Sequence, residues 1–157
     1  MSLLISFIAQ YLVFAVVLIA IIAVLLSPSP IRISILKLVV LSSLIAYLFA
    51  FVAGIFYYDP RPFVVEHIQP LFPYSADNGF PSEHTLFATV IAGAIFIYRR
   101  KLGIFLGAMG ILIGVARVAA AVHHPIDIIG GIAIAVIATY ISWTILKFAD
   151  KSFRRYP

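Results

Sequence analysis

Five long apolar stretches constrain this chain more than any other feature of its sequence. They cover about residues 3–26, 33–57, 82–98, 102–122 and 126–148, and prolines or charged residues separate them. A helix needs about 20 apolar residues to cross the hydrocarbon core of a bilayer. The pattern therefore predicts an all-α integral membrane protein, a bundle of about five transmembrane helices in a single domain covering residues 1–157.

The composition agrees with a membrane protein. Of the 157 residues, 64% are hydrophobic and only 11% are charged, and the mean hydropathy is +1.15. A soluble domain has about 25% charged residues. The absence of cysteine excludes disulfides and thiolate metal sites. The stretch at 3–26 exceeds the roughly 7–15 apolar residues of a secretion signal and has no basic residues before it, which predicts a retained anchor.

The distribution of positive charge predicts the orientation. If the five stretches alternate across the membrane, nine of the 11 lysines and arginines fall at one end of the bundle. The positive-inside rule makes that end cytoplasmic, with the N-terminus outside and the C-terminus inside. The net charge of +5 is then a sign of topology, and no nucleic-acid partner is expected. The nine cations are Arg32, Lys37, Arg99, Arg100, Lys101, Lys147, Lys151, Arg154 and Arg155.

The other end of the bundle collects the remaining polar groups. Arg61 and Arg117 meet all four histidines and five of the six acidic residues there. A charge at the centre of a membrane helix costs about 2.5–3.5 kcal/mol, so such groups usually serve a function. The one long connection, residues 59–81, lies at the same end and is expected to cover the site or dip into the membrane interface. We therefore expect an active site on the extracytoplasmic side of an inner or plasma membrane.

Two polar segments can each bind an anion: one surrounds Arg61 at the start of the long connection, and the other opens the third stretch. Arg61 lies between two prolines, which restrict the backbone, and its planar guanidinium matches phosphate; alternatively, it extends to lipid headgroups. In "GFPSEHT", Pro81 is expected to start a helix and to place Ser82 and the amides of Glu83 and His84 in its first turn. Such a turn offers unpaired N–H donors to an anion, although an ordinary helix start explains it equally well.

The third polar segment is "ARVAAAVHHPIDIIGG", residues 116–131. His123 follows Arg117 by six residues, and Asp127 lies four residues further on, at the start of the last helix. A carboxylate at this spacing can hold one imidazole nitrogen and make the other a better nucleophile or base. His124 is an alternative partner, and a self-satisfied interfacial cluster is the alternative to function. Together the three segments predict a phosphate site with a nucleophile and a proton donor.

The three segments, "RP" at 61–62, "PSEH" at 81–84 and "AR-x5-H-x3-D" at 116–127, resemble the type-2 phosphatidic acid phosphatase superfamily. The pattern of that family is K-x6-RP, PSGH and SR-x5-H-x3-D. The resemblance implies that His123 is a nucleophile forming a phosphohistidine, that Asp127 orients it, and that His84 protonates the leaving group. It also implies a phosphate cradle that needs no metal or cofactor, formed by Arg61, Ser82, Arg117 and the backbone amide of Glu83.

The chain departs from the family pattern at three positions. Gly54 stands in place of the lysine, Glu83 in place of the glycine of the second motif, and Ala116 in place of the serine of the third. The first two departures and "YYDPRPF" are similar to the bacitracin-resistance type of undecaprenyl-diphosphate phosphatase. The family commonly has six spans, one more than this chain. The expected reaction is hydrolysis of undecaprenyl diphosphate to the monophosphate in the outer leaflet; the alternatives are lipid A 1-phosphate, phosphatidylglycerophosphate and phosphatidic acid.

Two other classes of function stay open. A metal-dependent enzyme or transporter would take its ligands from His84, His123, His124, Asp127 and Glu66. The two nearby arginines would repel a cation, which argues against it. A non-catalytic scaffold would use a face of small residues, which can pack inside the bundle or form a homodimer. That face consists of Gly103, Gly107, Gly110 and Gly114.

Overall fold

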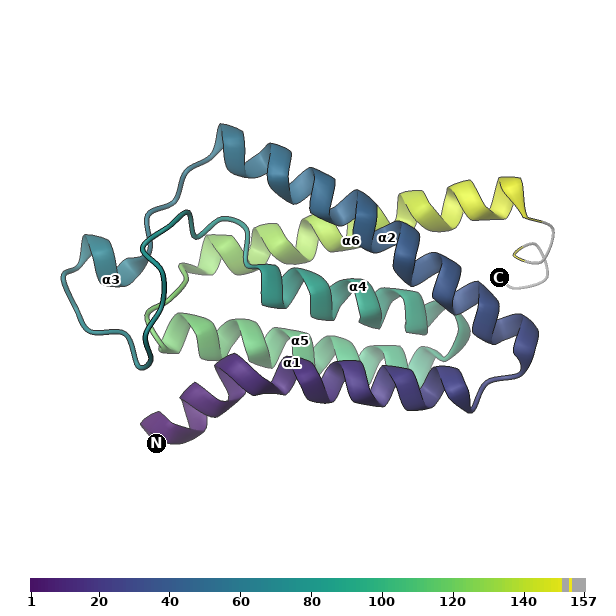
Figure 1. Ribbon diagram of the computed structural model, residues 1–157, viewed down its shortest axis with the longest axis horizontal. Coiled ribbons are helices and arrows are strands. Elements are labelled where there is room, and N and C mark those ends of the chain that lie inside the picture. Colours follow the sequence, from purple (N-terminus) through teal and green to yellow (C-terminus); the bar gives the residue numbers. More distant parts are fainter. Residues whose placement is uncertain (151–152, 154–157) are drawn as a thin grey trace.

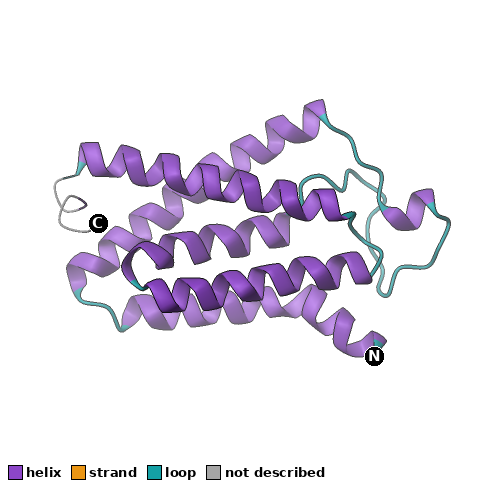
Figure 2. Cartoon of the chain, turned by 180° about the vertical axis from the view of Figure 1, so that it is seen from behind, coloured by secondary structure: helices purple, strands orange, loops and turns teal. Residues whose placement is uncertain are grey.

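The computed structural model describes residues 1–150 and Phe153, and these residues contain six helices. Five long helices form a bundle: α1 (Ser2–Leu25), α2 (Ser29–Phe56), α4 (Glu83–Tyr98), α5 (Arg100–Ala119) and α6 (Pro125–Ala149) (Figure 1). The short helix α3 (Pro62–Val65) lies in the long loop (Figure 2). The prediction of an all-helical fold is confirmed. Three cations of the charge pattern, Lys151, Arg154 and Arg155, lie outside the described residues.

Four of the described helices, α1, α2, α5 and α6, are long and apolar enough to cross a membrane. The predicted span at 82–98 corresponds to α4, which has 16 residues. At 1.5 Å per residue such a helix is about 24 Å long, shorter than a hydrocarbon core of about 30 Å. It packs against all four long helices and lies in the middle of the bundle. The shortest helix of the five is thus enclosed by longer neighbours.

Two connections between helices differ from the prediction. Only Arg99 separates α4 from α5, so the charged hairpin predicted at 98–101 is a single residue, and the other cations belong to α5. Helix α5 ends at Ala119 instead of residue 122, because the chain turns at Ala121, which has a φ of 60°. His123 therefore lies in the loop between α5 and α6. Helix α6 begins at Pro125, as predicted, since proline suits a first helical position.

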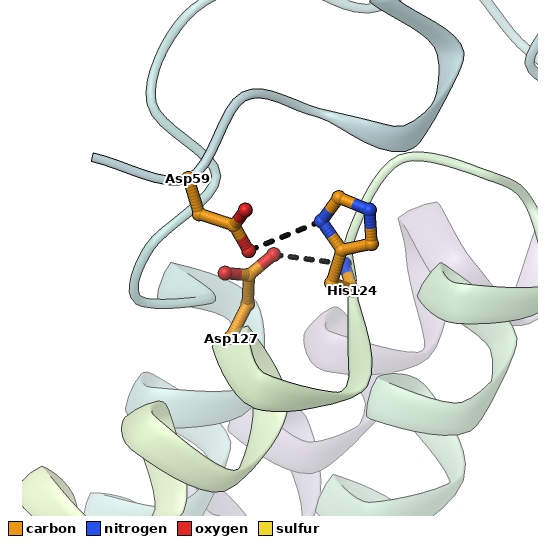
Figure 3. A group of neighbouring side chains, drawn as sticks. All are labelled: Asp59, His124 and Asp127. Atoms are coloured by element: carbon orange, nitrogen blue, oxygen red, sulfur yellow. Dashed lines mark hydrogen bonds and ion pairs between the residues drawn. The ribbon is translucent and has the colours of Figure 1, made fainter. Parts of the chain in front are cut away.

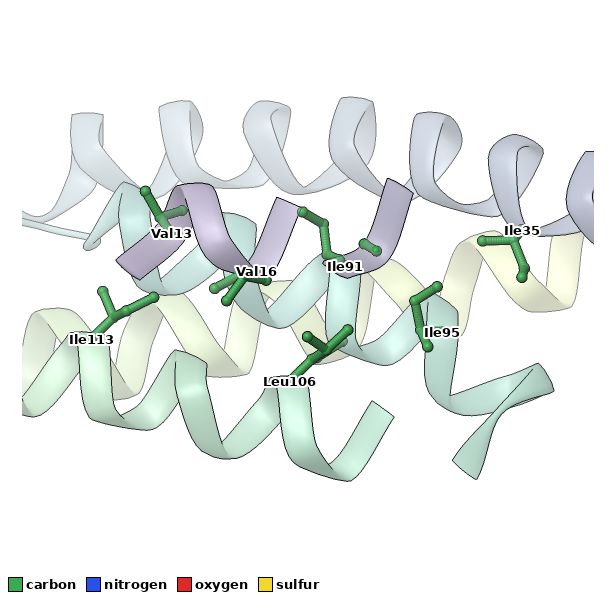
Figure 4. Packing of buried hydrophobic residues seen from close by; sticks show 10 residues of the cluster. Val13, Val16, Ile35, Ile91, Ile95, Leu106 and Ile113 are labelled. Carbon is green, nitrogen blue, oxygen red and sulfur yellow. The ribbon is translucent and has the colours of Figure 1, made fainter. Parts of the chain in front are cut away.

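The core lies where α1, α2, α4 and α5 meet. Its apolar side chains interdigitate in Figure 4, which labels Val13, Val16, Ile35, Ile91, Ile95, Leu106 and Ile113. The buried positions of α1 recur every three or four residues, as expected for one helix face. Lipid is as apolar as these side chains, so close packing, more than removal from water, holds such helices together.

The four glycines of α5 lie inside the bundle. A β-carbon added at Gly103, Gly107 or Gly110 would point at α4, and one at Gly114 would meet Ile128 of α6. Of the two placements that the sequence left open, the structure shows packing within the chain. Within the chain, this glycine face packs against α4 and α6.

Replacing Gly103 by alanine is expected to destabilise the bundle. The new β-carbon would overlap the backbone of Phe96 on α4, and overpacking of this kind costs about 1–3 kcal/mol. Gly107→Ala is the matched control, because its β-carbon would lie 3.9 Å from that of Ala92, an ordinary contact. Thermal unfolding in detergent should show a lower midpoint for the first variant only. Equal midpoints would mean that α4 and α5 separate easily at this contact.

Candidate active site

The site lies at the end of the bundle where α4 and α6 begin and α2 and α5 end. The long loop and the α5–α6 loop meet there, with the Leu71 amide donating to the Ala120 carbonyl at 3.2 Å. Buried polar side chains gather between the two loops and the helix ends. They are Arg61, Ser82, Arg117, His123 and Asp127. Five side chains predicted from three separate segments thus come together in one place.

Asn78 organises the part of the long loop that reaches the site. Its Oδ1 accepts hydrogen bonds from the backbone amides of Asp59 at 2.9 Å and Phe80 at 3.0 Å. Its Nδ2 donates to the carbonyls of Gly54 and Tyr57, both at 3.1 Å. One amide side chain therefore ties the end of α2 to the segment that precedes α4. The same bonds fix the backbone that carries the first arginine of the site.

His123 and Asp127 form a buried pair. The Nδ1 atom of His123 lies 3.0 Å from Oδ2 of Asp127, and the same oxygen accepts from the backbone amide of His124 at 2.9 Å. Asp127 thus caps the first turn of α6 and holds the imidazole at once. With its proton on Nδ1, the imidazole presents the lone pair of Nε2 to the site.

Arg117, on α5, contacts α1, the long loop and the imidazole nitrogen that carries this lone pair. Its side chain is fully buried. Nη1 donates to the carbonyl of Ala9 on α1 at 3.1 Å. Nη2 lies 2.6 Å from the hydroxyl of Tyr74 and 3.1 Å from Nε2 of His123. These contacts hold the guanidinium in one orientation beside the imidazole.

Arg61 approaches the same imidazole nitrogen from the long loop. Its Nη1 donates to the carbonyl of Val122 at 2.8 Å and lies 3.3 Å from Nε2 of His123. Its Nε and Nη2 contact Oδ1 of Asp77 at 2.7 and 2.6 Å. Nη2 also donates to the carbonyl of Asn78 at 3.2 Å. The side chain of Asp77 is 62% exposed while that of Arg61 is 6% exposed, so Asp77 is the partner that can leave.

Tyr74 is a site residue that the sequence did not single out. Its ring contacts both arginines, with the Cζ atoms of Arg61 and Arg117 at 4.4 and 4.9 Å from its centre. It also meets the His123 ring edge to face, with the centres 6.3 Å apart. An aromatic ring holds two like charges side by side through cation–π contacts. No feature of the sequence distinguishes Tyr74 within the long connection, because no spacing relates it to the motifs.

The start of α4 supplies the remaining predicted residues. Ser82 is the N-cap of α4, so it precedes the first turn in which the sequence placed it. Its buried hydroxyl lies 3.2 Å from that of Thr85, and its amide donates to the carbonyl of Asp127 at 3.1 Å. Glu83 and His84 begin the helix and line the cavity described below. The unpaired amides of this first turn point to the same end of the bundle.

Figure 3 shows a contact between His124 and Asp59, next to Asp127, that sequence reasoning missed. Nδ1 of His124 lies 3.1 Å from Oδ2 of Asp59. Burial, followed by the negative charge of Asp127, raises the pKa of the Asp59 carboxyl. Among the described residues, Asp59, His124 and Asp127 are the group whose donor atoms lie close enough to hold a metal. The ligand set of the metal alternative, with His84, His123 and Glu66, is not assembled.

The environment of His123 favours its neutral form. Burial lowers the pKa of its imidazole below the ordinary value of 6.5. The hydrogen bond to Asp127 opposes that shift, while the positive charges of Arg117 and Arg61 add to it. A neutral imidazole keeps the lone pair that a nucleophile needs.

The pKa of His123 predicts one limb of the pH profile. Because the folded protein holds this pKa below 6.5, the lone pair persists as the pH falls and is lost only below the lowered value. We expect kcat/KM for phosphate release to fall on the acid side with a midpoint below pH 6.5. A midpoint above 6.5 would contradict a neutral, buried nucleophile.

A cavity of about 860 Å³ connects the polar site with the lipid-facing surface of the bundle. Its polar end is lined by Arg61, Tyr74, Asp77, Glu83, His84 and His123. Its apolar part runs between α1 and α2, which diverge toward this end in Figure 1, and includes Phe14 and Phe51. Gly54, at the position of the family's lysine, also lines the cavity. No lysine lines it in the described part of the chain.

The chain is similar in sequence to known proteins. The profile of the PAP2 superfamily matches residues 35–151. Undecaprenyl-diphosphatase BcrC of Bacillus subtilis (strain 168) is 37% identical over 94 residues, which cover 60% of this chain and 47% of the relative. Bacitracin transport permease protein BcrC of Bacillus licheniformis is 27% identical over 112 residues, 70% of this chain and 55% of the relative. The chain therefore spans about half the length of the curated relatives it matches.

The fold also has a solved counterpart. The crystal structure of Aquifex aeolicus LpxE superposes with a TM-score of 0.73 at 25% sequence identity. The superposition covers 91% of this chain and 85% of the other. The arrangement of the helices is thus shared even where most side chains differ.

Proposed function

Because the chain belongs to the PAP2 superfamily, we propose that it is a lipid phosphatase of the cell membrane that hydrolyses undecaprenyl diphosphate. The observation that carries this proposal is the environment of His123. Its Nε2 faces Arg61 and Arg117 at 3.3 and 3.1 Å, while its Nδ1 is held by Asp127 at 3.0 Å. The proposed nucleophile is therefore in direct contact with its proposed orienting carboxylate and with both proposed phosphate-binding cations.

In the first step the terminal phosphoryl group binds with its outer oxygens on Arg61 and Arg117, the Ser82 hydroxyl and the amides at the start of α4. Nε2 of His123 attacks phosphorus, a P–N bond forms, and the bond to the oxygen of the lipid monophosphate breaks. His84, at the mouth of the cavity, donates a proton to that oxygen. Asp127 stabilises the positive charge that develops on the imidazole.

In the second step water replaces the lipid. His84, now neutral, takes a proton from the water, whose oxygen attacks the phosphorus of the phosphohistidine. The P–N bond breaks, the electron pair returns to Nε2, and inorganic phosphate leaves. The protein ends the cycle in its starting protonation state. The residues of this chain supply every group in the scheme.

Three features support a lipid diphosphate as the substrate. A relative with 37% identity is named an undecaprenyl-diphosphatase. The apolar part of the cavity offers a path for a hydrocarbon tail between α1 and α2. The cavity reaches the site at the end of the bundle, where the phosphate of a lipid would lie. Lipid A 1-phosphate, phosphatidylglycerophosphate and phosphatidic acid are the alternatives, because the same groups can act on each of them.

A substrate panel tests the proposal. Phosphate release would be measured in detergent with EDTA from undecaprenyl diphosphate, phosphatidic acid, phosphatidylglycerophosphate and lipid A 1-phosphate. We expect the highest kcat/KM with the diphosphate. A higher value with any monoester would reassign the substrate within the family. No release from any of the four by folded protein would overturn the phosphatase proposal.

Asp77→Asn is expected to lower KM. In the free protein the carboxylate of Asp77 occupies two donors of Arg61, and phosphate must displace it. Because the Asp77 side chain is 62% exposed, the ion pair is weak, and its loss should reduce KM by up to about fivefold with little change in kcat. Michaelis profiles of the two proteins check this. A higher KM in the variant would show that Asp77 positions Arg61 instead of competing with phosphate.

A further inference from the structure

We infer that a second cavity, at the end of the bundle opposite the candidate active site, binds one anionic phospholipid. This cavity has a volume of about 830 Å³ and lies between the end of α4, the start of α5 and the second half of α6. Figure 2 shows these segments at the far end from the long loop. The proposed ligand takes no part in the phosphatase reaction.

The walls of the cavity suit a hydrocarbon chain. A single residue joins α4 to α5, so those two helices stay close, while α6 runs on past them. Gly93 and Gly103 line the cavity, and both sit at close helix contacts, Gly93 against Thr139 of α6 and Gly103 against Phe96 of α4. The rings of Phe96, Tyr140 and Trp143 and the side chains of Ile97 and Val136 also line it, beside the hydroxyls of Thr89 and Thr139. A mainly apolar lining of this kind favours an acyl chain.

The mouth of the cavity suits a negatively charged headgroup. Arg100 lines the cavity, with its guanidinium 5.6 Å from the centre of the Phe96 ring. The ammonium of Lys147 lies 4.6 Å from the centre of the Trp143 ring. No aspartate or glutamate lines the cavity in the described part of the chain. Cations beside interfacial aromatic rings attract lipid phosphate, and they favour a lipid with net negative charge over a zwitterionic one.

The chain carries its own reporter for this site, because Trp143 is its only tryptophan. The full chain would be reconstituted in vesicles containing phosphatidylglycerol or phosphatidylcholine with brominated acyl chains, which quench tryptophan on contact. We expect phosphatidylglycerol to quench Trp143 at a lower mole fraction, corresponding to about fivefold tighter binding from one cation. Equal quenching by the two lipids would overturn the inference.

Two neighbouring cations provide a matched pair of variants. Arg100→Gln removes the cation that lines the cavity, whereas Lys101→Gln removes an equal charge from an exposed residue that does not. We expect the preference for phosphatidylglycerol to disappear in the first variant and to remain in the second. An equal loss in both would indicate a general attraction to the surface, and no loss in either would place the preference elsewhere. Either of these outcomes contradicts a specific site.

Phosphate release separates this inference from the proposed phosphatase. Arg100 and Lys101 lie at the opposite end of α5 from Arg117. Unchanged release in both variants would show that they are folded. A chain with no phosphatase activity on any substrate could still show the lipid preference, so the two proposals fail independently.

Discussion

His123→Ala is expected to reduce phosphate release from undecaprenyl diphosphate by at least about 10³-fold, since the change removes the proposed attacking atom. No neighbouring group can replace it. The other imidazole in the loop, His124, is hydrogen-bonded to Asp59. Release would be measured in detergent with EDTA, and the wild-type protein should form an acid-labile phosphoprotein that the variant does not form.

His124→Ala is the matched control for this change. It removes an adjacent imidazole of the same chemistry, but its backbone amide still donates to Asp127. We expect it to retain most of the activity of the wild type. Equal release by the wild type and His123→Ala, with loss in His124→Ala, would show that the nucleophile is the other histidine. Loss in both would point to the conformation of the loop.

Asp127→Asn is expected to lower kcat by roughly 10⁴-fold while the protein stays folded, as loss of the charge does in other aspartate–histidine pairs. Asp127 has two roles, since one oxygen accepts from both the His123 ring and the His124 amide. An asparagine oxygen can still cap α6, but it does not stabilise a positive imidazole or fix the proton on Nδ1. Asp127→Asn should therefore lower the activity and leave the stability nearly unchanged.

The control for this prediction is Asp127→Ala, which loses the cap as well. It should be as inactive as the asparagine variant and less stable by about 0.5–2 kcal/mol. Thermal unfolding in detergent compares the two. Because the hydrogen bond to Asp127 raises the pKa of His123, the residual activity of Asp127→Asn should persist to lower pH than that of the wild type. An unchanged kcat in Asp127→Asn would remove the carboxylate from the mechanism.

The sequence predicted the elements whose signals are local. The contact between His123 and Asp127 follows from a proline at the first position of α6, because that position fixes which residue lies one turn into the helix. The apolar stretches predicted the five long helices, because a run of apolar residues is also a local signal. The predicted end of α5 was wrong, because the chain turns at Ala121 with a positive φ, and an alanine in the sequence does not predict such a turn.

The residues that the sequence missed belong to the long loop. Tyr74 contacts two arginines and Asp59 faces His124, yet neither stands at a fixed spacing from its partner. The position of Asp59 depends on Asn78, whose side chain also bonds backbone groups more than 20 residues away, and that of Tyr74 on its contacts with the two arginines. Tertiary hydrogen bonds of this kind determine loop structure and leave no periodic trace in a sequence.

The divergence of α1 from α2 also determines which substrate concentration controls the reaction rate. The exposed rings of Phe14, Tyr47 and Phe51 line the cavity there, so for the proposed lipid substrate we expect entry sideways from the bilayer. A substrate then arrives by diffusion in two dimensions, while phosphate departs into water. The rate should follow the mole fraction of substrate in the membrane or micelle, so adding inert detergent at constant bulk substrate would slow the reaction.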